Sequence, residues 1–451
     1  MGVAVVNFLS NPLMGTTLTY RAIAHRAWPI ILANAAVPLL GLVDTAVIGN
    51  TGNTQQLGAI ALGALIFNFV YWSFGFLRMS TTGFTAQAAG ANNSVQVRAI
   101  LGRALMTALV ISAVILLLQG WLGTAIFALL QASSEVEGLA RDYFFIRLWG
   151  APASLATFAL LGTLVGLGKS GRLLAVQVFL NGTNAILDII FAGWMGWGVQ
   201  GIAYGTLIAE WATFILALCI VVQMLRKEWS DDTPFWNWNL IVDRQALVQM
   251  ISANRDIMIR TLFLVLSFAW FTHKSATYGD TVLAANHILL QFVSFSAFFL
   301  DGYAFVAEAI VGTAIGAKRR QEFDLGIRRS SVLGLITSCV LALIFAVLGA
   351  QFIALLTDIE SVRASAYTFL PLACVYIVVS VAAFQLDGIF IGAVRSADMR
   401  NAAIVSTILF IAASKLLESF GNVGLWWCFI VYVVLRAVSL LYYFPALRRS
   451  V

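Results

Sequence analysis

Six acidic side chains interrupt stretches of this 451-residue sequence that are otherwise as apolar as a lipid tail. They are Asp44, Asp188, Glu210, Asp301, Glu308 and Asp387. A charge at membrane depth is costly, so such residues usually face a partner or a water-filled cavity and are candidates for function. The chemistry open to them is the binding and release of a proton or of a small hard cation.

The segment around Asp188 carries a polar stripe. Gln177, Asn181, Asn184 and Asp188 follow one another at spacings of four, three and four positions. These spacings place all four on one face of a helix. A polar stripe on an otherwise apolar helix is expected to face a neighbouring helix rather than lipid.

Asp44, Asp188 and Thr206 are expected at a similar depth, because each lies close to the outer end of its apolar segment. Two nearby carboxylates in a low dielectric do not both remain ionised easily, so this pair is predicted to take up a proton. The oxygens of Asp44, Asn184, Asp188 and Thr206 could instead ring a sodium ion. The alternative to both is a hydrogen-bonded pair that only locks two helices together.

The other acidic residues are secondary candidates. Glu210 follows Thr206 by one helical turn, and Asp301 and Glu308 are seven apart, on one helix face. Asp301 and Glu308 could equally form a packing network near the cytoplasm.

Pro29 and Pro38 lie in the first apolar segment. A proline inside a helix removes a backbone hydrogen bond and permits a kink, so Pro29 is a predicted hinge of the helix that carries Asp44. The alternative is that Pro29 only begins the helix, where proline costs little.

The whole composition indicates a membrane protein. Hydrophobic residues make up 61% and charged residues 11%, with a mean hydropathy of +0.90. Twelve stretches approach the roughly 20 apolar residues that cross a bilayer, and only helices satisfy the backbone of such runs in lipid. They are 28–49, 58–83, 98–119, 141–166, 172–194, 199–224, 247–272, 282–313, 327–355, 364–392, 401–419 and 424–446.

Charge and repetition set the expected topology. Basic residues gather at both ends and in alternate loops, so the positive-inside rule predicts that both termini are cytoplasmic. The halves match at a constant shift of 226, as in AQAAGA (86–91) with GTAIGA (312–317), which predicts two parallel repeats of six helices. The expected divisions are a cytoplasmic N-terminus (1–27), a first lobe (28–224), a charged, tryptophan-rich linker (225–246), a second lobe (247–446) and a tail (447–451).

The sequence does not support a disulfide, a metal site or a catalytic site. The cysteines, Cys219, Cys339, Cys374 and Cys428, are far apart in apolar runs and match no disulfide or metal pattern. The three histidines are scattered, and neither HExxH nor GxSxG occurs. We therefore expect no enzyme activity, no cofactor, no structural metal and no nucleic-acid partner.

Four motifs together resemble the multidrug and toxic compound extrusion (MATE) family. They are PLLGLVDTAVIG (38–49), AQAAGA (86–91), GLGKSG (166–171) and NAILDIIF with GWGVQGIAYGT (184–206), and NRDIMIRT (254–261) with LDGYAFVAEAIVGTAIGA (300–317) is similar to its DinF-like branch. The resemblance implies a central cleft between two lobes and export of bulky cationic or amphipathic compounds. It also implies that Asp44, Asn184, Asp188 and Thr206 are the coupling residues and that helix 1 bends at Pro29.

The expected function is therefore that of a monomeric antiporter in the inner membrane of a bacterium, driven by protons. The sodium-type branch carries a glutamate in helix 7, whereas 257–272 here has no carboxylate, which favours coupling in the first lobe. Sodium coupling remains the first alternative. A flippase for lipid-linked oligosaccharides is the second, and an expected scarcity of basic residues at membrane depth argues against it.

Overall fold

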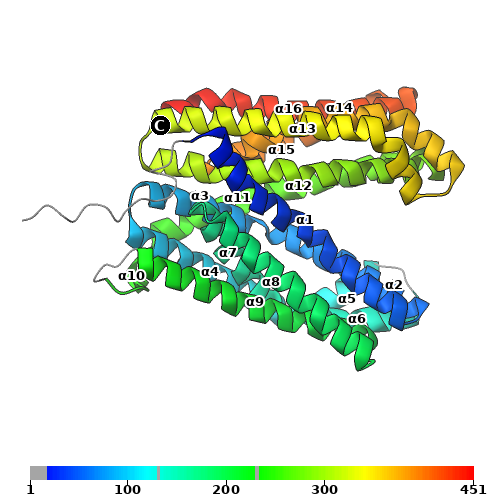
Figure 1. Cartoon of the computed structure of the whole chain (residues 1–451), viewed down its shortest axis with the longest axis horizontal. Coiled ribbons are helices and arrows are strands. Elements are labelled where there is room, and N and C mark those ends of the chain that lie inside the picture. The colour runs from blue at the N-terminus through cyan, green and yellow to red at the C-terminus, as the bar shows by residue number, and fades with distance from the viewer. Residues whose placement is uncertain (1–17, 130–132, 229–232) are drawn as a thin grey trace, which may run out of the picture. The chain divides into compact units, whose positions relative to one another are not determined.

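The computed structural model describes residues 18–129, 133–228 and 233–451, and in these ranges the chain is helical without a β-strand. Figure 1 shows the helices running alongside one another within each half of the chain. In chain order they are α1 (Tyr20–Thr51), α2 (Thr54–Phe74), α3 (Phe76–Gly90), α4 (Ser94–Leu117), α5 (Gln119–Leu129), α6 (Ser134–Leu148), α7 (Ala151–Gly166), α8 (Ser170–Asp188), the π-helix η1 (Ile189–Trp194), α9 (Gly198–Glu228), α10 (Trp238–Ile241), α11 (Arg244–Thr277), α12 (Asp280–Gly316), α13 (Arg320–Leu356), α14 (Glu360–Gly392), α15 (Ser396–Leu416), the short 3-10 helix η2 (Glu418–Phe420) and α16 (Gly421–Arg449).

The predicted number of spans and the all-α fold are confirmed. Eleven helical stretches in the described residues are long and apolar enough to cross a bilayer, and α2 with α3 counts as one of them. A twelfth span is made by α6 and α7 together, which meet at a bend of 53°. Gly150 lies at this joint and Pro152 stands in the first turn of α7, where a proline suits the start of a helix.

Other details were not predicted. Most helices are longer than the apolar stretches, because hydropathy marks the lipid-facing length and not the polar turns that continue beyond it. The short helices α5 and α10 were expected to be loop. The wider π-helical turn after Asp188 leaves no mark in the hydrophobic pattern.

The duplication is visible in the helix boundaries, which recur after 226 positions. Matching ends and starts are Gly90 with Gly316, Ser94 with Arg320, Gly166 with Gly392, and Ser170 with Ser396. Left-handed backbone recurs at the same shift, at Asn92 (φ 54°) with Lys318 (φ 54°) and at Gly168 (φ 67°) with Val394 (φ 56°). The two halves therefore share their backbone path as well as their order of helices.

A close helix contact is duplicated as well. A Cβ at Gly162 of α7 would collide with the carbonyl oxygen of Arg78 in α3, and one at Gly388 of α14 would collide with that of Ala304 in α12. Only glycine lets two helix backbones approach so closely. A glycine at the point of contact thus allows close packing both of α3 with α7 and of α12 with α14.

The helices form two compact units. The described residues 32–129, 133–228 and 233–249 make the first, here called the N-lobe, and residues 18–31 with 250–451 make the second, the C-lobe. The first turns of α1 thus belong to the C-lobe, where Ile23, Ala27 and Ile30 pack in one core with Val306 and other residues of α12. The remainder of α1 joins the N-lobe, where Ile48 packs in a core with α2, α6 and α9.

The described part of the predicted linker contains helical segments. Helix α9 continues to Glu228, and α10 packs against α4, where the side chain of Ile241 lies against Gly102. Arg98 of α4 donates a 2.7 Å hydrogen bond to the hydroxyl of Thr233. This part of the linker therefore belongs to the N-lobe fold.

Candidate cation site

The four predicted coupling residues meet inside the N-lobe. Asp44 comes from α1, Asn184 and Asp188 from α8, and Thr206 from α9, and each is at most 2% exposed. The carboxyl groups of Asp44 and Asp188 lie within hydrogen-bonding reach of each other. The amide of Asn184 donates to the hydroxyl of Thr206 over 2.9 Å, and that hydroxyl donates to the carbonyl of Ile202 over 3.0 Å.

The site is short of positive charge and of donors. Both carboxylate oxygens of Asp188, Oδ1 of Asp44 and Oδ1 of Asn184 are buried and accept no hydrogen bond within the described part of the chain. Leaving a buried acceptor unsatisfied costs about 1–3 kcal/mol, and more for a charged group. Two carboxyl groups can bond to each other only if one carries a proton, so a proton or a cation is needed to complete this site.

Local backbone features bring Asp188 to this position. The π-helical segment starts at Ile189, directly after Asp188, and such wider turns are frequent at functional sites. On α9, Gly205 faces Oδ1 of Asp188, and a Cβ there would collide with that oxygen. About two turns before the pair, the amide of Asn181 donates to the carbonyl of Ala36 over 3.0 Å and ties α8 to α1.

A buried cation beside the pair was not predicted. Arg147, near the end of α6, donates to Glu210 of α9 over 2.6 Å and to the hydroxyl of Tyr143 over 3.0 Å. Its guanidinium also lies 4.5 Å from the centre of the Phe67 ring. Arg147 acts electrostatically on both Asp44 and Asp188. The signal in the sequence was an arginine within the fourth apolar stretch, whereas the predicted site residues are all acidic or neutral.

The secondary candidates are spread over both lobes. Gln177 and Asn181 are half-buried and share the face of Asn184 and Asp188, as expected. Glu210 is buried and pairs with Arg147. Asp301 is half-buried and Glu308 is buried, and both lie on α12 in the C-lobe. Pro29 is half-buried inside α1 rather than at its start, while Pro38 lies in the same helix outside the part whose side chains are described.

The C-lobe does not repeat the acid pair. The positions 226 residues after Asp44 and Asp188 are Trp270 and Ser414, whose side chains form a 2.8 Å hydrogen bond. The positions equivalent to Asn184 and Thr206 are Phe410 and Tyr432, whose ring centres are 5.4 Å apart. The duplicated positions are thus again in contact, but all four residues are neutral and three of them are aromatic.

No three His, Cys, Asp or Glu side chains gather as metal ligands among the described residues. A sodium ion at the acid pair would therefore also depend on the neutral oxygens of Asn184 and Thr206. Such oxygens are the ligands that hard cations prefer.

Comparison with known proteins identifies the family. The MatE family model matches residues 29–190 and 257–416, and the chain belongs to this family. DNA damage-inducible protein F of Escherichia coli K12 is 36% identical over 429 residues, covering 94% of this chain and 92% of its own. A probable multidrug resistance protein NorM of Deinococcus radiodurans is 29% identical and covers 75% of this chain and 73% of its own.

Solved structures agree on the fold. A MATE protein in the bent conformation gives a TM-score of 0.87 at 17% identity, covering 99% of both chains. A MATE protein in the straight conformation gives 0.85 at 17% identity, covering 99% of this chain and 98% of the other. The chain is thus a multi-pass membrane transporter of the MATE family.

Proposed function

We propose that this protein is an antiporter that exports bulky cationic or amphipathic compounds in exchange for protons. The observation that carries the proposal is the buried contact between Asp44 and Asp188, with three of its four carboxylate oxygens accepting no hydrogen bond. Such a pair binds a small cation far more readily than it stays doubly ionised. We further propose that both termini are cytoplasmic, that the protein acts as a monomer and that it resides in the inner membrane of a bacterium.

In this mechanism, a proton enters from outside while the transporter is open to that side. It neutralises the pair and changes the hydrogen bonds between α1 and α8. Helix α1 then repacks near Pro29, and a cationic guest loses the negative charge that attracted it. Moving one charge across 100 mV supplies about 2.3 kcal/mol, which is enough to bias such a cycle.

The test is drug efflux by variants in which the two carboxyl groups lose their charge. Asp44→Asn and Asp188→Asn are expected to reach the membrane at normal levels but to lose drug resistance and proton-driven transport. The matched control is Asp142→Asn, because Asp142 is an exposed carboxylate on α6 whose only hydrogen bond in the described chain comes from Gln200. Full resistance in either test variant would remove that residue from the coupling mechanism.

The coupling ion is decided by reconstitution. In proteoliposomes, a pH gradient alone is expected to drive efflux, and a sodium gradient alone is not. The reverse result would replace the proton by sodium, held by Asp44, Asn184, Asp188 and Thr206 as ligands. A loss of sodium-driven transport in Thr206→Val would then support that ligand set.

A flippase for lipid-linked oligosaccharides is the second candidate, because the expected scarcity of basic residues at membrane depth, which argued against it, is not found. Few basic residues were expected at membrane depth, but Arg147, Arg260 and Arg436 are buried inside membrane-spanning helices. Basic side chains there suit phosphate groups. Binding of a lipid-linked oligosaccharide to purified protein, with no effect of drug-like cations, would favour this candidate over drug export.

A further inference from the structure

The C-lobe contains a buried cluster in which one acid serves two arginines. Asp387 of α14 accepts through Oδ2 from Arg260 of α11 and from Arg436 of α16, the latter at 2.5 Å. All three residues are buried, with side-chain exposures of 10% or less. In the described chain, no second carboxylate pairs with either arginine, so the cluster holds one surplus positive charge.

Three donors of this cluster are unused. The Nε–H groups of Arg260 and Arg436 and the hydroxyl of Tyr432 are buried and have no hydrogen-bond partner among the residues that the structure describes. Tyr432 precedes Arg436 by one turn on α16, so the two share a helix face. Tyr376 of α14 also lies close enough to Arg436 to interact electrostatically. The cluster therefore combines surplus positive charge with donors that lack an acceptor.

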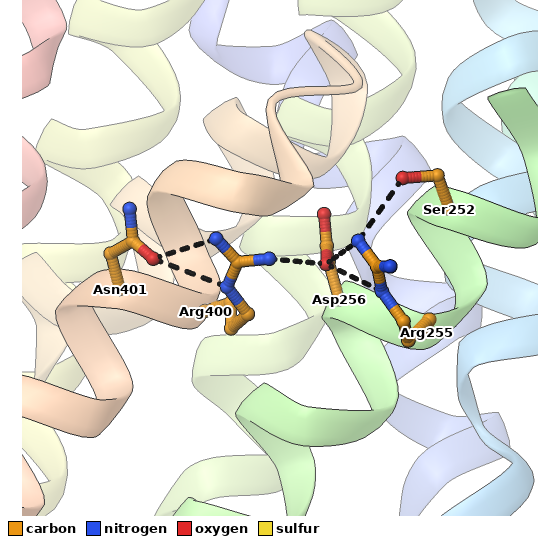
Figure 2. A network of polar contacts seen from close by, with 5 residues as sticks. All are labelled: Ser252, Arg255, Asp256, Arg400 and Asn401. Atoms are coloured by element: carbon orange, nitrogen blue, oxygen red, sulfur yellow. Dashed lines mark hydrogen bonds and ion pairs between the residues drawn. The ribbon is translucent and has the colours of Figure 1, made fainter.

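A similar arrangement at the protein surface needs no extra ion. Figure 2 shows Asp256 of α11 accepting from Arg400 at 2.8 Å and from Arg255 at 3.2 Å. Here too one acid serves two arginines, but the Arg255 side chain is 58% exposed and water can solvate its charge. The surplus charge at Arg260 and Arg436 has no such access to solvent, and burying an uncompensated ion costs several kcal/mol.

The two lobes have opposite polarity at equivalent positions. Arg436 stands 226 residues after Glu210, and Tyr432 stands 226 after Thr206, so α9 and α16 present an acid and a base at the same place in the repeat. The N-lobe site has three acids, Asp44, Asp188 and Glu210, beside one arginine, whereas the C-lobe cluster has one acid beside two arginines. Three separate observations thus indicate that the C-lobe cluster needs an anion: its surplus positive charge, its unused donors and its contrast with the N-lobe site.

We propose that Arg260, Arg436 and Tyr432 form a binding site for a monovalent anion, either a halide such as chloride or the carboxylate group of an organic substrate. The anion would accept hydrogen bonds from the unused donors and neutralise the surplus charge. An arginine fork suits a carboxylate, and a hydroxyl donor serves both kinds of anion. This site is separate from the proposed cation site and does not depend on proton coupling.

The test measures thermal unfolding of the full chain, purified in detergent. The unfolding midpoint is followed as sodium chloride, or in a second series sodium benzoate, replaces sodium sulfate at constant ionic strength. We expect a saturable rise with at least one of the two anions. Saturation with chloride alone would identify a halide site, and tighter saturation with benzoate would identify a carboxylate site. The absence of a saturable rise with either anion would overturn the proposal.

Variants locate the site. Arg436→Gln leaves Asp387 paired with Arg260 alone, so the rise should disappear. Tyr432→Phe removes one hydrogen bond to a charged ligand and should weaken binding by about tenfold or more. Arg400→Gln, in the partly exposed cluster of Figure 2, is the control and should keep the full rise. If Arg436→Gln does not fold, Tyr432→Phe decides, and an unchanged affinity in that variant contradicts the site.

Discussion

The position of Asp188 depends on one missing side chain. Gly205 of α9 is the residue against which Oδ1 of Asp188 lies, and a methyl group there would displace that oxygen. We therefore predict that Gly205→Ala lowers proton-driven efflux by roughly tenfold or more, because a small displacement of a reacting group is costly. The measurement is the initial rate of efflux from proteoliposomes.

The control for this prediction lies on the facing helix. Gly182 of α8 is exposed, and a Cβ added there would meet nothing within 4 Å. Gly182→Ala should keep the normal rate. Equal rates for both alanine variants would mean that the position of the Asp188 carboxyl group does not limit transport.

The ion pair between Arg147 and Glu210 gives a prediction about stability. Both side chains are buried, so Arg147→Gln leaves a buried negative charge without its cation and should lower the free energy of unfolding by about 3–5 kcal/mol. The double variant with Glu210→Gln should recover much of the loss. Urea unfolding in detergent measures both changes.

A surface pair supplies the contrast. Arg141 and Glu137, one turn apart on α6, are both about a third exposed. Arg141→Gln should cost less than about 1 kcal/mol, because water screens such pairs. A similar loss for Arg141→Gln and Arg147→Gln would mean that burial does not set the strength of these two pairs.

Some residues of the candidate site could be predicted from the sequence and others could not. Asp44 and Asp188 were found because a carboxylate in an apolar run is conspicuous, and helical spacing added Asn184. Arg147 escaped because its importance depends on how α6 meets α9, and spacing along the chain does not reveal contacts between distant helices. The arginine partners of Asp387 were missed for the same reason.

At the scale of helices, α1 contributes to both compact units, as does α11, whose first residues (244–249) belong to the N-lobe. In α1 the division falls between Ile31 and Leu32, within one turn of Pro29. We predict that Pro29→Ala raises the thermal unfolding midpoint, since an interior proline costs a helix about 3 kcal/mol. The same change should slow efflux, if repacking of α1 limits the cycle.

The comparison variant is Pro371→Ala, because Pro371 also lies inside a helix, α14, whose residues all belong to the C-lobe. It should stabilise the protein without slowing transport. Measuring the unfolding midpoint and the efflux rate for both variants separates the two effects. A Pro29→Ala protein with normal turnover would remove the hinge from the mechanism.

The helices themselves were largely predictable, because a bilayer demands long apolar runs and these are easily counted. The bend between α6 and α7 was not predicted, although Gly150 and Pro152 marked it. The apolar stretch 141–166 is uninterrupted, and a hydropathy profile does not show where a helix changes direction. Helix ends were predicted too short wherever polar turns extend the helix.

At the scale of the whole molecule, two similar backbones carry different chemistry. The N-lobe acid pair corresponds to the hydrogen-bonded pair of Trp270 and Ser414 in the C-lobe. We predict that Ser414→Ala leaves proton-driven efflux and its pH dependence unchanged, whereas Asp188→Asn abolishes both. The measurement is efflux against external pH for the two variants in parallel.

A shifted pH profile in Ser414→Ala would indicate that the C-lobe takes part in coupling. The duplication behind this comparison was recognisable from short sequence matches at a constant shift. What the sequence matches did not reveal was that the equivalent positions are still in contact, because contact depends on how the helices pack.

The turn before α15 has the same backbone conformation as the equivalent turn in the first half, but a different residue. Val394 has a φ of 56°, where its counterpart in the first repeat is Gly168. A β-branched residue is strained in that conformation, whereas glycine adopts it freely. The second half thus has the same bend as the first, formed by a residue that is strained in it, so the geometry between these consecutive helices recurs although the residue differs.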